Sequence, residues 1–204
     1  MKFQQVPEYI DGLPNISGSE DLSEVMKSAL KKNVFTKNNP VQFDKIRSAT
    51  AIALHMHQPL IPAGGSDLRT ADLISNLQYM MENQGIGDNH NAPVFHWCYK
   101  RMGEFIPQLM NEGKEPRVML EYSGTLFHGL RKMGLNDVFD NLQLITREEP
   151  YKRAVEWLGC PWGHAVAPST PVQDYRLQVK AWLHHFAGIF GTEALERVRG
   201  FSPS

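Results

Sequence analysis

The sequence predicts an α/β fold built from parallel strands that are separated by helices. The run at 49–54 is short, apolar and without polar alternation, as expected for a strand covered on both faces, and 117–122 and 154–158 are further strand candidates. The segments between them carry apolar residues at helical spacing. Strands that alternate with helices form parallel βα units, so we expect a barrel or an open, doubly wound sheet. In both folds the functional residues lie at the carboxyl ends of the strands.

The composition is that of a globular protein and argues against several classes of partner. The chain has 204 residues, of which 42% are hydrophobic, and 21 basic against 22 acidic side chains give a net charge of −1. Without a long charged run, this balance argues against nucleic acid and against an anionic membrane as partners. No segment resembles a signal peptide or approaches the length of a membrane span. Cys98 and Cys160 lie far apart and favour two free thiols, so we expect a cytoplasmic protein.

Residues 1–45 are predicted to form a helical N-terminal extension to a domain at 46–204. The extension is polar and rich in turn residues, and it contains one helix. Asp21 followed three residues later by Glu24 is typical of a capping box at a helix start. An apolar stripe follows at helical spacing, and we expect it to pack on the main body; its members are Leu22, Val25, Met26, Ala29 and Leu30.

The main domain is predicted to continue as strand, loop and helix in turn. After the first strand, a helix is expected from about Leu73 to Gly85, and a second one from Pro93 to Gly113. The strand at 117–122 leads into a short helix that ends at Gly134. Asn136 then begins another helix, and the strand at 154–158 precedes a helix at 173–190 that Gly191 closes.

The most informative motif is His55-Met56-His57, which follows the first predicted strand. Residues two apart on a strand point the same way, so both imidazoles can reach one pocket. They could be polar residues bonded locally, or hydrogen-bond a sugar hydroxyl together with Gln58, since imidazole both donates and accepts. They could also be metal ligands, with further ligands drawn from His90, His96, His128 and His164.

Several motifs resemble glycoside hydrolase family 57, whose members are α-glucan hydrolases, branching enzymes and glucanotransferases. HMHQP at 55–59 is similar to the His-Gln-Pro signature near the start of its catalytic domain. EYSGTLFHGL at 121–130 and AVEWLG at 154–159 resemble its next segments, and HAVAPSTP at 164–171 resembles a His-Pro segment in which Ala165 replaces the first proline. FGTEALERVRGFSPS at 190–204 resembles the approach to the nucleophile. The resemblance covers about 47–204.

This resemblance implies a partial (β/α)7-type barrel and an α-glucan-active glycoside hydrolase or glucanotransferase of the retaining type. It implies no metal and no organic cofactor, and an α-glucan or oligosaccharide as the partner. The nucleophile is expected directly after Ser204, so no catalytic residue is expected within the chain, and the chain alone is expected to be inactive. Glu121 and Glu156 lie on adjacent predicted strands, but Glu121 is more simply a strand residue paired locally. The residues expected to bind substrate are His55, His57, Gln58, Glu156, Trp162 and His164.

Two other functions stay open. One is a metal-dependent hydrolase, an amidohydrolase or a polysaccharide deacetylase, that uses His55 and His57. The other is a non-catalytic carbohydrate-binding protein. A partial barrel would also leave unpaired strand edges, so self-association through those edges is expected.

Overall fold

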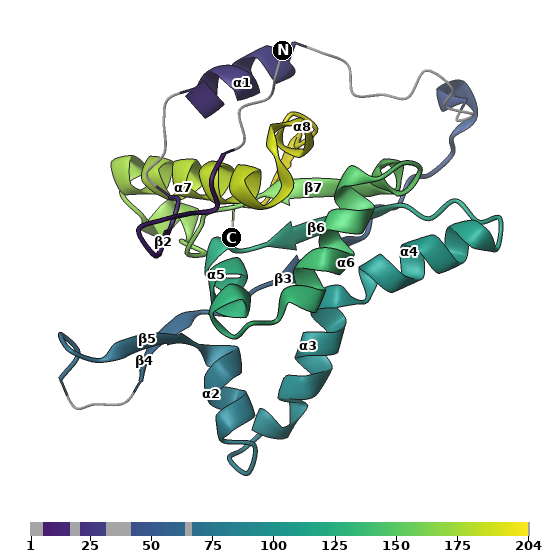
Figure 1. Ribbon diagram of the computed structural model, residues 1–204. Helices are drawn as coiled ribbons and strands as arrows, with labels where there is room; N and C mark the ends of the chain where they lie inside the picture. Colours follow the sequence, from purple (N-terminus) through teal and green to yellow (C-terminus); the bar gives the residue numbers. More distant parts are fainter. Residues whose placement is uncertain (1–5, 17–20, 32–41, 64–66, 204) are drawn as a thin grey trace.

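The chain forms a mixed α/β structure around a parallel sheet, shown in the computed structural model of Figure 1. The structure describes residues 6–16, 21–31, 42–63 and 67–203. Within them, four parallel strands lie in the order β3 (Ala53–Met56), β6 (Val118–Tyr122), β7 (Val155–Gly159) and β8 (Gly200–Phe201). The predicted parallel βα arrangement is therefore confirmed, while the barrel stays a prediction.

The first strand lies later in the chain than predicted. The sequence places it at 49–54, whereas β3 runs from Ala53 to Met56. The ladder with β6 sets this position, because Ala53 pairs with Met119 and Met56 with Tyr122. Ile52 is 62% exposed and lies before that ladder. As a result, His55 is a residue of the strand itself and His57 follows it directly.

A β-hairpin occupies the segment where the sequence analysis expects a loop and a helix start. β4 (Leu60–Ala63) pairs antiparallel with β5 (Asp72–Ser75), and α2 begins only at Asn76 and ends at Glu82. The Ser75 side chain caps this helix by accepting a hydrogen bond from the backbone N–H of Leu77. The predicted helix start at Leu73 is therefore wrong, because Leu73 and Ile74 belong to the strand before the cap.

The remaining helices follow the prediction closely, apart from one break. The predicted helix at 93–113 is two helices that meet at Arg101. The helices of this part are α3 (Ala92–Lys100), α4 (Met102–Asn111), α5 (Gly124–Lys132), α6 (Asn136–Arg147), α7 (Val172–Phe190) and α8 (Thr192–Leu195). Short 3-10 turns lie at Phe43–Lys45, Asn89–Asn91, Tyr151–Arg153 and Ala167–Ser169.

The core lies against one face of the sheet. Leu120, Tyr122 and Trp157 point from β6 and β7 into it and are at most 4% exposed. Aromatic side chains of α5 and α7 pack on them, as in the stacked rings of Tyr122 and Phe127. Because side chains alternate along a strand, His55 and Glu121 point to the opposite face.

The described part of the N-terminal extension packs on this body, as predicted for its helix. It contains the short strands β1 (Tyr9–Ile10) and β2 (Leu13–Pro14) and the helix α1 (Asp21–Ala29), which lies near α8 (Figure 1). Arg199 donates a hydrogen bond of 2.7 Å to the carbonyl oxygen of Ala29, and Glu8 pairs with Arg131 at 2.7 Å. Cys98 and Cys160 are free thiols, as predicted. None of the described helices has the length and apolar character needed to cross a bilayer.

Candidate functional site

Three histidines come together at the carboxyl ends of the parallel strands. His55 is on β3, His57 follows β3, and His164 lies in the loop after β7. Two residues from the end of β6 support them: Glu121 pairs with His55 across the ladder, and Ser123 begins the turn into α5. We call these five residues the rim cluster. They lie where parallel α/β sheets place their chemistry.

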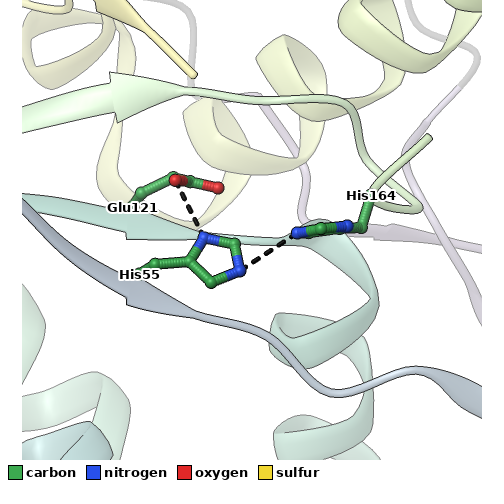
Figure 2. Close-up of side chains that lie close together, drawn as sticks. All are labelled: His55, Glu121 and His164. Atoms are coloured by element: carbon green, nitrogen blue, oxygen red, sulfur yellow. Dashed lines mark hydrogen bonds and ion pairs between the residues drawn. The ribbon is translucent and has the colours of Figure 1, made fainter. Parts of the chain in front are cut away.

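His55 connects a buried carboxylate to His164 (Figure 2). Its Nδ1 lies 2.9 Å from Oε2 of Glu121, and its Nε2 lies 3.0 Å from Nε2 of His164. The Glu121 side chain is 4% exposed, whereas that of His55 is 48% exposed. With the carboxylate as acceptor, Nδ1 of His55 carries the proton, so Nε2 of His55 is the acceptor in its contact with Nε2 of His164.

Glu121 is an unusual residue for a sheet interior. One oxygen accepts from His55, but Oε1 has no nitrogen or hydroxyl donor among the described residues. The Cys160 thiol is nearby: burial raises its pKa, and the charge and hydrogen bonding of Glu121 raise it further. A thiol is a weak donor, so Glu121 depends mainly on His55 for its stabilisation.

His57 is held in place by the residue that caps α5. Its Nδ1 lies 2.8 Å from Oγ of Ser123, which also accepts from the backbone N–H of Leu126 and contacts the Thr125 hydroxyl. The His57 ring centre lies 4.2 Å from that of His164. Burial, followed by the nearby His164 and His55, lowers the pKa of His57 to about 4, although Glu121 opposes the shift. His57 is therefore neutral at pH 7.

His164 adopts a backbone conformation that is rare for a residue with a side chain. Its φ is +60°, in the left-handed region. Hydrogen bonds of the two preceding residues fix the loop: the backbone N–H of Trp162 donates to the Gln178 carbonyl, and that of Gly163 donates to the Gln178 side chain at 2.6 Å. Outliers of this kind persist where the surrounding structure holds them, often at functional sites.

The other residues predicted to bind substrate lie outside the rim cluster. Gln58 is buried and bonds with Tyr99 and Asn76. Trp162 donates to His185 and so anchors the loop that carries His164. Glu156 is exposed and on the same sheet face as His55, but it pairs with Met119, two residues before Glu121.

The remaining candidate metal ligands of the sequence analysis also lie elsewhere. His96 bonds with Asp137, His128 with Tyr9, and His90 with the Gly87 carbonyl. Of the four histidines considered as partners for His55 and His57, the structure brings only His164 to them. From the sequence, local pairing is the simpler role for Glu121, and Ser123 is not predicted as a site residue. Their positions could have indicated a role at the site. Glu121 lies on the strand beside the one that carries His55, and Ser123 lies in the turn directly after that strand.

Comparison of the chain with models of known protein families, with curated proteins and with solved structures finds no match.

Proposed function

We propose that the rim cluster binds an oligosaccharide, as part of the substrate site of an α-glucan-active glycoside hydrolase or glucanotransferase with a (β/α)7-type barrel. The observation that carries the proposal is the convergence of His55, His57 and His164 from two different βα units. The motif resemblance to glycoside hydrolase family 57 supports the same substrate class.

The chemistry of the cluster suits sugar hydroxyls. A neutral imidazole donates from one nitrogen and accepts at the other, so it can bond with a hydroxyl in either direction. Glu121 and Ser123 each hold one ring through Nδ1, which leaves Nε2 of His57 without a partner among the described residues, while Nε2 of His55 contacts Nε2 of His164. Rings fixed in this way lose little conformational entropy when a ligand binds.

The described carboxylates support binding rather than bond cleavage. A retaining glycosidase needs two carboxyl groups about 5 to 5.5 Å apart, one of them a nucleophile. Glu121 is buried and engaged with His55, and Glu156 is its diagonal neighbour on the adjacent strand, with backbone positions roughly 7 to 8 Å apart. We therefore expect this chain to bind oligosaccharides without turning them over, as a non-catalytic carbohydrate-binding protein would.

Calorimetric titration with maltoheptaose tests the proposal. His57→Asn is the informative variant, because an amide can keep the contact with Ser123 but lacks the distal nitrogen. We expect it to weaken binding about tenfold, the effect of losing one hydrogen bond. His90→Ala is the matched control, since His90 is exposed and, within the part of the chain that the structure describes, bonds only with the Gly87 carbonyl.

Two results would contradict the proposal. One is a wild-type chain that binds no α-glucan oligosaccharide, and the other is a His90→Ala chain that loses as much affinity as His57→Asn. A third result would overturn the expectation that the chain binds without turnover. If the wild-type chain releases reducing sugar and a carboxylate substitution in it abolishes this release, a catalytic pair lies among its residues.

A cytoplasmic setting is part of the proposal. Cys98 and Cys160 are both free thiols, which is the usual state of cysteine in a reducing compartment. An α-glucan stored inside the cell would be a substrate source compatible with that setting.

A further inference from the structure

The rim cluster also fits a ligand of a different kind. We propose that His55, His57 and His164 bind a divalent transition metal ion such as Zn²⁺, with Glu121 and Ser123 holding two of the imidazoles in position. This site goes beyond the sugar-binding function and does not depend on it, because its ligand is the ion itself.

The spacing of the ring nitrogens is close to that of a metal site. Nε2 of His55 and Nε2 of His164 are 3.0 Å apart, and one ligand atom each of His55, Glu121 and His164 lie within 4.8 Å of one another. Histidine nitrogens bind zinc at about 2.0 to 2.1 Å, which places two nitrogens of a tetrahedral site about 3.3 Å apart. An ion between His55 and His164 thus requires the rings to separate by only a few tenths of an ångström.

The ring centres of the three histidines form a triangle rather than a row. Their centres are 4.8 Å apart for His55 and His164, 4.2 Å for His57 and His164, and 6.4 Å for His55 and His57. Three imidazoles on one tetrahedral ion have centres about 5 Å apart, given nitrogens about 2 Å from the metal. Bringing all three to that spacing requires the His57 ring to move away from His164 and toward His55 by roughly 1 to 1.5 Å.

The supporting hydrogen bonds are those that metal-binding histidines require. Such a histidine donates its other ring N–H to a carboxylate or another acceptor, which fixes its orientation and makes the binding nitrogen more basic. Glu121 takes this role for His55, and Oγ of Ser123 can accept from His57 while its own proton points to Thr125. Nε2 of His57 and Nδ1 of His164 have no hydrogen-bond partner among the described residues.

Charge and access also favour a cation. Glu121 is a buried carboxylate with one oxygen lacking a strong donor, so a positive ion bound to the other ring nitrogen of His55 would stabilise it. His55 is 48% exposed, which leaves a way in for the ion. Three protein ligands leave a fourth position for water or for a substrate oxygen, the arrangement of reactive rather than structural zinc sites.

The test measures metal content and coordination. The purified chain is stripped with a chelator, mixed with a small excess of Zn²⁺, separated from free ion and analysed by mass spectrometry. Co²⁺ in place of Zn²⁺ gives visible absorption that reports tetrahedral coordination. The main variant is His164→Gly, because glycine accepts the φ of +60° at this position without strain. His90→Ala removes a histidine from an exposed site and is the control.

We expect the wild-type chain and His90→Ala to keep about one zinc per chain, and His164→Gly to lose it. Glu121→Gln should weaken zinc binding about 10- to 100-fold, the usual effect of changing such a supporting group. Circular dichroism checks that each variant is folded. The proposal is overturned if the wild-type chain keeps no zinc, if His164→Gly keeps as much as wild type, or if His90→Ala loses it.

Metal binding and sugar binding are separable in these experiments. Titration with maltoheptaose in the presence of chelator reports the sugar site alone, and zinc analysis without sugar reports the metal site alone. A chain that binds sugar but no zinc overturns only the metal site, and one that binds zinc but no sugar overturns only the proposed function.

Discussion

At the residue scale, His185 is a buried group whose protonation should control acid stability. It is fully buried and accepts a hydrogen bond from Trp162 through Nδ1. Burial, followed by the nearby His128 and Arg131, lowers the pKa of His185 from 6.5 to about 3. The unfolded chain binds a proton below about pH 6.5 whereas the folded chain does not until about pH 3, so stability is lost as pH falls through that range.

The variant His185→Asn should reduce this loss. Its amide can still accept from Trp162 but does not titrate. We expect its free energy of unfolding to depend less on pH between 6.5 and 3 than that of wild type, with a difference of the order of a few kcal/mol at the acid end. Urea unfolding at several pH values measures it. Equal slopes for both chains would show that His185 does not carry the acid sensitivity.

Gly124 is a second residue on which the site depends. A Cβ at this position would overlap the indole of Trp162, the residue that anchors the loop of His164. We expect Gly124→Ala to destabilise the fold by about 1 to 3 kcal/mol, as overpacking does, and to weaken ligand binding. Gly85→Ala is the control, because nothing lies within 4 Å of a Cβ there. Similar unfolding midpoints for both variants would contradict this role for Gly124.

The predictable part of the site is the part that depends on local spacing. The His-x-His motif sits on one strand, so the approach of His55 and His57 to one site follows from their positions alone. The role of Glu121 depends on which residue of β3 lies opposite it. The sequence does not show that this residue is His55, because the two strands are far apart in the chain. Gln58 follows His57 directly, yet its side chain lies outside the site. Its hydrogen-bond partners are Asn76 in α2 and Tyr99 in α3, and its position after His57 does not reveal them.

At the scale of elements, helix α1 is expected to stabilise the main body through its apolar stripe. Leu22 is 4% exposed, whereas Leu30, just beyond the helix, is 64% exposed. We expect Leu22→Ala to lower the free energy of unfolding by about 2 to 3 kcal/mol, within the range for buried leucines. Leu30→Ala should change it by less than about 0.5 kcal/mol. Equal effects in denaturant titrations would mean that the helix does not pack as described.

Elements with one clear pattern were predicted, and those with two competing patterns were not. Three predicted elements have boundaries within one or two residues of the observed ones: the strand at 117–122 is β6, the strand at 154–158 is β7, and the helix at 173–190 is α7. The hairpin of β4 and β5 was not predicted, because Leu73 and Ile74 have the same helical spacing as the apolar residues of α2. They therefore looked like its first turn, although the helix begins only after its cap, Ser75. Only the pairing with β4 makes that segment a strand.

At the scale of the whole molecule, the outer strands of the sheet are expected to mediate self-association. Among the described residues, β3 and β8 are the two end strands of the sheet, and each has a neighbouring strand along one edge only. Ile52, directly before β3, is exposed. Unpaired strand edges favour pairing with another chain. Analytical ultracentrifugation should show dimers that grow with concentration and that Ile52→Lys reduces. Leu68→Lys, at another exposed apolar residue, should leave them unchanged. A monomer at all concentrations would contradict the expectation.

The most direct test of the rim cluster as a single site is nuclear magnetic resonance of the histidine ring nitrogens during addition of maltoheptaose. The chain has eight histidines, so the signals can be assigned one variant at a time. We predict that the signals of His55, His57 and His164 shift together along one saturation curve, while those of His90 and His96 stay in place. Shifts spread over all histidines, or none in the three, would contradict a shared oligosaccharide site.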